Sequence, residues 1–91
     1  MWYVYILKCR DSSFYAGITN NIQRRLARHN SGKASKYTRA RRPVKLLYVE
    51  SFDSKDSALH REIEIKSFSR DNKNKLIKFG LGRRFPSAAK I

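Results

Sequence analysis

Three short segments of this 91-residue chain have the composition of β-strands, and they constrain the fold more than any other feature. They read WYVYILKC (residues 2–9), FYAGI (14–18) and VKLLYVESF (44–52), and each is rich in β-branched and aromatic residues. Only the turn-forming letters RDSS separate the first two, which predicts a hairpin. The third segment is expected to pair with this hairpin, and helices are then needed to cover the sheet.

Helical segments follow the second and third strands. The letters TNN offer caps for a helix from about Ile22 to His29 or Asn30, and DSKD caps a second helix that reaches about Ser69. A last short helix is expected over roughly 72–79. The expected fold class is therefore α/β of the α+β kind, with a three-stranded mixed or antiparallel sheet flanked by three helices in the order β-β-α-β-α-α.

The charge of the chain indicates its partner. Lys and Arg number 21 against 7 Asp and Glu, a net charge of +14, which attracts a polyanion and most often nucleic acid. The stretch 31–43 contains no acid and is expected to be a long basic loop or partly ordered insertion. Its cations would contact backbone phosphates, which positions nucleic acid without reading its sequence. The cations in and beside this stretch are Lys33, Lys36, Arg39, Arg41, Arg42 and Lys45.

The chain length fits one domain, expected over residues 1–80, with a flexible basic tail over 81–91. The single cysteine, Cys9, excludes an internal disulfide and a Cys-rich zinc site and favours a reduced, cytoplasmic setting. The apolar start from Trp2 to Leu7 is too short to span a membrane and lacks the basic leader of a signal peptide. No membrane partner is expected, and the chain is treated as a monomer.

One carboxylate, Glu62, occupies an unexpected place in the predicted helix ALHREIEIKSF (58–68). At about 100° per residue it falls near the middle of the apolar arc, whereas His60, Arg61 and Glu64 fall on the opposite side. A carboxylate that faces a core costs several kcal/mol unless a cation or a hydrogen-bond partner meets it. The apolar arc consists of Ala58, Leu59, Ile63, Ile65 and Phe68.

The predicted hairpin carries three tyrosines in notable positions. Tyr3 and Tyr5 lie on one face of the first strand because side chains alternate along a strand. Tyr15 comes just before Gly17, where the backbone can turn tightly or let a ligand approach. Aromatic pairs across strands are usually structural, so these residues alone favour core packing over function.

The first predicted helix carries Arg25 and His29 one turn apart, along the edge of its buried line. Arg24 and Arg28 are expected to point elsewhere, toward solvent. A guanidinium at the position of Arg25 either lies at the surface with its stem buried or points into a pocket, where it can hold a phosphate bidentately. A histidine at a helix end is more often a capping cation than a catalyst, so His29 matters only if these groups converge.

Four separated segments together resemble the GIY-YIG nuclease superfamily. VYIL is followed ten residues later by YAG, then by an arginine eight residues beyond Gly17, then by a glutamate in a later helix. YAGITNNIQRRLARHNSG, RRPVKLLYVESF and REIEIKSFSR are similar to its small stand-alone bacterial-type members. The likeness covers the chain from Tyr3 to about Ile77 and departs from the signature at Tyr3, Ala16 and Ile18.

The resemblance implies a metal-dependent endonuclease that cleaves phosphodiester bonds in DNA with little sequence preference, in repair or nucleic-acid processing. By position it implies that Tyr5 and Tyr15 are the signature tyrosines, that Arg25 is the signature arginine and that Glu62 is the metal ligand. His29 and Tyr37 match further polar positions. A single carboxylate with a substrate phosphate suits Mg²⁺, or Mn²⁺, because Mg²⁺ keeps several of its waters.

The implied chemistry assigns a role to each group. Arg25 would neutralise charge on the phosphate as water attacks in line. A cationic cleft is expected to lower the pKa of Tyr5 or Tyr15, and His29, with a free pKa near 6.5, is the easier base. We expect Tyr5 and His29 to act as partners in taking the proton, with Tyr15 orienting water or phosphate.

Two further interpretations stay open. In the first, the chain keeps the fold as a non-catalytic module that binds nucleic acid, DNA or RNA. In the second, it is a basic accessory protein bound to RNA or a protein complex, in which Tyr5, Tyr15 and Glu62 are structural. In that case a Glu62 that faces the core needs an internal partner, most plausibly a buried ion pair with Arg25.

Overall fold

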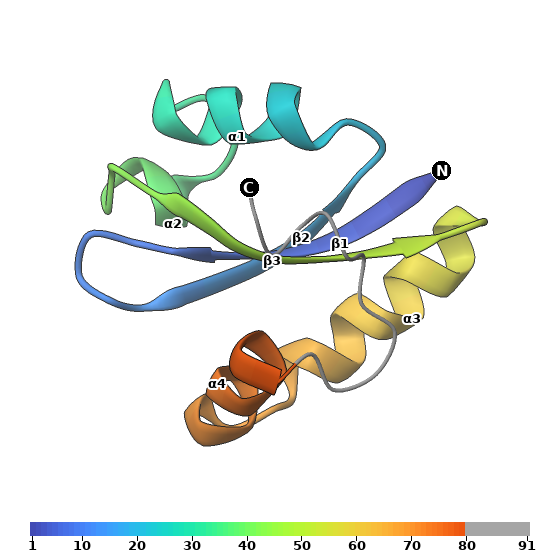
Figure 1. The fold of residues 1–91 in the computed structure, drawn as a ribbon. Helices are drawn as coiled ribbons and strands as arrows, with labels where there is room; N and C mark the ends of the chain where they lie inside the picture. Colours follow the sequence, from blue (N-terminus) through green and yellow to red (C-terminus); the bar gives the residue numbers. More distant parts are fainter. Residues whose placement is uncertain (80–91) are drawn as a thin grey trace.

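The computed structural model describes residues 1–79, and its element order confirms the expected α+β class with one small additional helix (Figure 1). No helix in this part of the chain is long and apolar enough to cross a membrane. The predicted tail, 81–91, lies outside the described residues. The elements are β1 (Trp2–Lys8), β2 (Phe14–Thr19), α1 (Ile22–Asn30), α2 (Lys36–Arg39), β3 (Lys45–Phe52), α3 (Lys55–Lys66) and α4 (Arg70–Phe79).

The sheet is antiparallel throughout, with strand order β2-β1-β3. β1 occupies the centre because it is the most apolar strand, with four consecutive buried residues from Val4 to Leu7. A residue of β1 therefore has a partner on each side, and Tyr5 lies opposite Gly17 of β2 and Val49 of β3. The pairing with β3 shifts register between Ile6 and Leu7.

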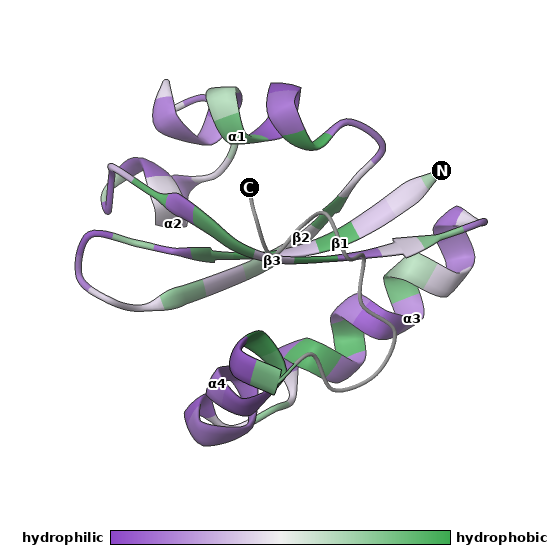
Figure 2. Cartoon of the chain, viewed as in Figure 1, coloured by the Kyte–Doolittle hydropathy of each residue, from purple (hydrophilic) through white to green (hydrophobic). Residues whose placement is uncertain are grey.

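Helices cover both faces of the sheet, α1 and α2 on one side and α3 and α4 on the other (Figure 1). Because strand side chains alternate, Tyr5 and Leu7 of β1 pack with the α1 residues Ile22 and Leu26. Val4 and Ile6 of β1 pack in the cluster that contains Ala58, Ile65 and Leu76 of α3 and α4. In Figure 2 the hydrophobic colour follows the strands and the hydrophilic colour dominates α1 and α4.

The predicted caps of α1 and α3 are present, and a further side-chain contact, at Ser69, explains an error in two helix boundaries. Asn21 caps α1 by accepting a hydrogen bond from the backbone N–H of Arg24 at 3.0 Å, and Ser54 of the DSKD stretch caps α3. α3 ends at Lys66 rather than near Ser69, and the last helix begins at Arg70 rather than near residue 72. The Ser69 hydroxyl accepts from the backbone N–H of Asn72 at 3.1 Å, so Ser69 belongs to the start of α4.

The orientation of α3 differs from the expected one. Ile63, assigned to the apolar arc, is 65% exposed, whereas Arg61, assigned to solvent, turns toward the sheet. Arg61 Nε and Nη2 each lie 2.9 Å from a carboxylate oxygen of Glu50 on β3, and the Tyr48 hydroxyl donates to the same carboxylate at 2.7 Å. Glu50 is fully buried and needs a cation, which rotates the helix to bring Arg61 inward.

Candidate active site

A buried hydrogen-bonded chain links β1, α1 and α2. The Tyr5 hydroxyl lies 2.9 Å from Nε2 of His29, and Nδ1 of His29 lies 2.8 Å from the Thr38 hydroxyl. If the Thr38 hydroxyl donates to the Ser35 carbonyl, 3.4 Å away, it accepts from the Nδ1–H of His29. In that tautomer Nε2 of His29 carries no hydrogen and accepts a hydrogen bond from the Tyr5 hydroxyl. Sequence analysis missed Thr38, because nothing in the letters SKYT beyond the Ser35 cap indicates that its hydroxyl is buried against a histidine.

His29 is neutral near pH 7. Burial and then the nearby positive charge of Arg25 lower its pKa from 6.5 to about 4. The free pKa near 6.5, which made His29 the easier base in the sequence analysis, does not hold at this site. A neutral ring that holds Nδ1–H in a hydrogen bond is ready to accept a proton at Nε2.

The pKa of Tyr5 is raised rather than lowered. Burial is the largest cause, the neighbouring Tyr15 adds to it, Arg25 opposes it and the charge of Glu62 raises it further. The expectation that the cationic groups lower the pKa of Tyr5 is wrong, because removing the phenolate from water outweighs one nearby cation. Both Arg25 and Glu62 act electrostatically on Tyr5, so both charges lie close enough to influence this phenol.

Gly17 makes room for this arrangement. A Cβ built at Gly17 would lie 2.6 Å from the Tyr5 hydroxyl oxygen and 2.8 Å from Cζ of the same ring, closer than any ordinary contact. The space that sequence analysis associated with a turn or a ligand is therefore occupied by the phenol of Tyr5 itself. The glycine lets Tyr5 reach across β2 toward His29.

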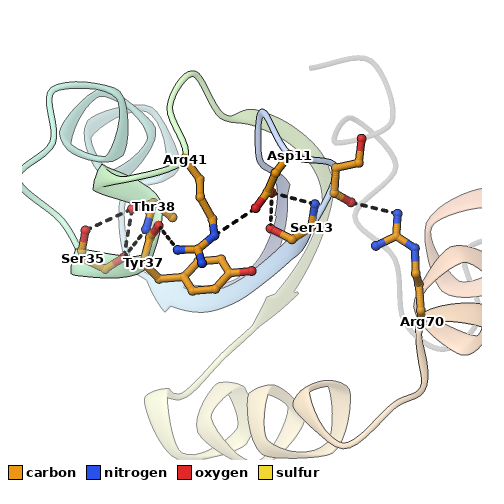
Figure 3. A network of polar contacts seen from close by, with 8 residues as sticks. Asp11, Ser13, Ser35, Tyr37, Thr38, Arg41 and Arg70 are labelled. Atoms are coloured by element: carbon orange, nitrogen blue, oxygen red, sulfur yellow. Dashed lines mark hydrogen bonds and ion pairs between the residues drawn. The ribbon is translucent and has the colours of Figure 1, made fainter.

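Tyr15 and Tyr37 form a stacked pair beside His29. The rings of Tyr15 and His29 meet edge to face at 5.2 Å, and Tyr37 stacks on Tyr15 at 5.9 Å between centroids. The guanidinium of Arg41 lies over the Tyr37 ring, 3.8 Å from its centroid, and its Nε lies 3.0 Å from Oδ2 of Asp11 (Figure 3). Tyr37 thus joins the site through its contact with Tyr15.

The predicted phosphate-contacting cations separate into two groups. Arg41 is held by Asp11, by the Tyr37 ring and by the Tyr37 carbonyl, so it serves the fold. The other five are exposed, namely Lys33, Lys36, Arg39, Arg42 and Lys45. The stretch expected to be a loop contains α2 and is tied to α1, because the Asn30 side chain bonds both the N–H and the carbonyl of Val44.

Glu62 is neither sealed in the core nor paired with Arg25. Its side chain is 16% exposed, and one carboxylate oxygen lies 3.4 Å from Nζ of Lys66 one turn along α3. Among residues 1–79 the Arg25 side chain has no hydrogen bond or ion pair to another side chain. The internal ion pair required by the accessory-protein interpretation is therefore not formed in the described part of the chain.

The donor set fits only a loosely held, hydrated ion. The described residues contain no group of three or more His, Cys, Asp or Glu side chains that could hold a metal. A lone partly exposed carboxylate such as Glu62 suits Mg²⁺ or Mn²⁺, which keeps its waters and takes its remaining ligands from a phosphate. It does not suit zinc, which takes three or four protein ligands.

Titration of His29 gives a testable pH dependence. Because its pKa falls to about 4 in the folded protein, the unfolded chain binds the proton more readily between pH 4 and 6.5. The contribution of neutral His29 to stability is fully present above pH 6.5 and is lost as the pH falls toward 4. The free energy of unfolding is therefore expected to fall by about 2 kcal/mol between pH 7 and pH 5. Urea unfolding at both pH values measures it, with His29→Gln as the control. An equal pH effect in the variant would contradict this assignment.

The fold and these site residues define the class of protein. Residues 1–76 match the GIY-YIG catalytic domain, and the chain belongs to this family. Family membership implies nuclease-type activity on a nucleic-acid substrate.

Relatives and solved structures agree with this assignment. The chain is 57% identical over 75 residues to UPF0213 protein SH2523 of Staphylococcus haemolyticus, covering 82% of this chain and 92% of the relative. It is 52% identical over 75 residues to UPF0213 protein NP_0776A of the archaeon Natronomonas pharaonis, covering 82% and 88%. The solution structure of UPF0213 protein BH0048 from Bacillus halodurans is 44% identical, with a TM-score of 0.58 over 90% of this chain and 88% of that one.

Proposed function

We propose that this protein is a metal-dependent endonuclease that hydrolyses phosphodiester bonds in DNA with little sequence specificity, in repair or processing. The observation that supports it most is the grouping of Tyr5, Tyr15, Arg25 and His29 on the α1 face, with the charge of Glu62 reaching Tyr5. A phenol and an imidazole can move a proton, a guanidinium can stabilise charge on the phosphate, and a carboxylate can hold the divalent ion, which are the functions that hydrolysis of a phosphodiester needs.

Arg25 is the group that would bind the scissile phosphate. Its guanidinium is not engaged by another side chain among residues 1–79, yet its charge is felt at Tyr5 and at His29. A guanidinium in this state can donate two parallel hydrogen bonds to phosphate oxygens. It would also stabilise the negative charge that grows as the nucleophile attacks.

Tyr5 and His29 together would take the proton of the attacking water. The Tyr5 oxygen accepts that proton while its own proton passes to Nε2 of His29, 2.9 Å away. The imidazolium that results is disfavoured in the free protein, since the His29 pKa is about 4. The negative charge of a bound phosphate favours the imidazolium and raises that pKa when the transfer is needed. Tyr15, edge-on to His29, would orient the water or the phosphate.

Glu62 would hold the divalent ion, in place of its contact with Lys66. When bound, such an ion stabilises negative charge on the phosphoryl and leaving oxygens. The five exposed cations from Lys33 to Lys45 would contact the phosphate backbone at the same time. These contacts carry no base information, which accounts for the proposed lack of sequence preference.

The proposed activity is tested with the purified chain and supercoiled plasmid, in Mg²⁺, in Mn²⁺ and in EDTA, with a structured RNA assayed in parallel. Nicking of the plasmid that requires either metal is the expected result. Plasmid binding without nicking would instead support the non-catalytic module, and neither binding nor nicking would support the accessory role. Cleavage confined to the RNA would contradict DNA as the substrate.

A further inference from the structure

A basic cavity lies at the start of α1 and shares Arg25 with the candidate active site. It has a volume of about 290 Å³. Its lining holds three arginines and no carboxylate, although two of these arginines were expected to point to solvent. The lining residues are Thr19, Asn20, Asn21, Arg24, Arg25 and Arg28. A concave surface with this much positive charge and no acid is suited to an anion.

The polar groups of the lining are hydrogen-bond donors with few internal partners. Within the described chain the Arg24 side chain has no hydrogen bond or ion pair. Nη2 of Arg28 donates one hydrogen bond to the Lys33 carbonyl at 3.1 Å. The Asn21 side-chain oxygen accepts from the backbone N–H of Arg24, which leaves its amide NH₂ group as a donor. The Thr19 hydroxyl is occupied by the backbone of Asn21. The hydrogen-bonding groups that remain in the lining are therefore almost all donors. They suit a ligand made of acceptors, such as a phosphate group.

Arg25 connects this cavity to the candidate active site. It lines the cavity, and its charge also acts on Tyr5 and on His29. A strand whose scissile phosphate lies at Arg25 would therefore place a neighbouring phosphate within reach of Arg24 and Arg28. On the basis of the proposed function, we propose that this cavity binds a phosphodiester of the cleaved strand next to the scissile one, through Arg24 and Arg28.

The proposal is tested by binding in EDTA, which separates it from cleavage. The affinity for a short DNA duplex is measured over a range of salt concentrations for the wild type, Arg24→Gln, Arg24→Lys and Lys75→Gln. Lys75 is exposed on α4, across the sheet from α1, so its variant loses the same charge away from the cavity. Log affinity falls as log salt rises, and Arg24→Gln is expected to make this fall shallower, with a slope about one smaller in magnitude. Arg24→Lys and Lys75→Gln are expected to stay near the wild-type slope.

Each outcome has a distinct meaning. Equal slopes for Arg24→Gln and Lys75→Gln would overturn the proposal, even if the plasmid is nicked. A shallower slope for Arg24→Gln alone supports phosphate binding in the cavity, even if the plasmid is not nicked and the proposed hydrolytic activity is rejected. Titrating the Asn20 and Asn21 amide signals with inorganic phosphate and with a single-stranded oligonucleotide distinguishes the two phosphate sources. The oligonucleotide is expected to shift them at much lower concentration, and equal potency would overturn the assignment to a backbone phosphodiester.

Discussion

Replacing Glu50 with alanine is expected to lower the free energy of unfolding by about 3–5 kcal/mol, because it leaves a partly buried guanidinium without its counter-charge. The Glu50 side chain is 1% exposed and accepts two hydrogen bonds from Arg61, each 2.9 Å long. It also accepts from the buried hydroxyl of Tyr48 at 2.7 Å. The hydrogen bonds to Glu50 raise the pKa of Arg61 in the wild type. In the variant the guanidinium still stays protonated, because arginine does not lose its proton in proteins, so its buried charge is left without a partner.

Urea unfolding followed by circular dichroism measures this effect, and the same helix offers a matched control. Glu64 also contacts Arg61, at 2.6 Å, but its side chain is 57% exposed, so Glu64→Ala is expected to cost about 1 kcal/mol or less. Replacing Glu50 and Arg61 together with Leu and Met removes both charges and is expected to recover much of the stability. Equal losses for Glu50→Ala and Glu64→Ala would contradict a structural role for the buried pair.

The strands and helix starts were accessible from the sequence because they depend on local composition. β1 contains a continuous run of buried residues, and Asn21 and Ser54 mark helix starts through side-chain acceptors that operate within three residues. The short helix α2 was missed because it lasts only four residues. The capping hydroxyl of Ser35 was its only local signal, and that signal is common in loops.

The rotation of α3 could not be obtained from its own periodicity. An apolar residue, Ile63, is exposed and a charged one, Arg61, is turned inward, because the deciding partner is Glu50 on another element. Hydrophobic periodicity contains no information about a carboxylate that lies eleven residues away. For the same reason Glu50 was not identified from sequence as the buried acid of this protein.

The candidate site was identified through a family resemblance rather than through spacing. Tyr5 and His29 are 24 residues apart, and no local pattern predicts that their polar atoms meet. The pKa of Tyr5 was expected to fall and instead rises, and the lowering of the His29 pKa was not foreseen, because burial was not visible in the sequence. Both side chains lie beneath α1 and α2, where loss of solvent outweighs the surrounding positive charge.

Glu62→Gln is expected to abolish metal-dependent cleavage while the protein stays folded. Glutamine keeps the shape of the side chain and removes the charge that a divalent cation needs. Charge stabilisation by a bound ion is worth several kcal/mol in the transition state, so the expected fall in rate is at least about a hundredfold. The folded state loses only the helical ion pair with Lys66, whose side chain is 55% exposed. The free energy of unfolding is therefore expected to change by about 0.5 kcal/mol or less.

The most direct test of the account is the initial rate of plasmid nicking in Mg²⁺ for the wild type, Glu62→Gln and Glu64→Gln. The two variants lose the same charge two positions apart on α3, and Glu64 points away to solvent with its side chain 57% exposed. The account predicts that nicking falls by at least about a hundredfold in Glu62→Gln and stays near the wild-type rate in Glu64→Gln. Equal nicking rates for the two variants, both folded by circular dichroism, would contradict it.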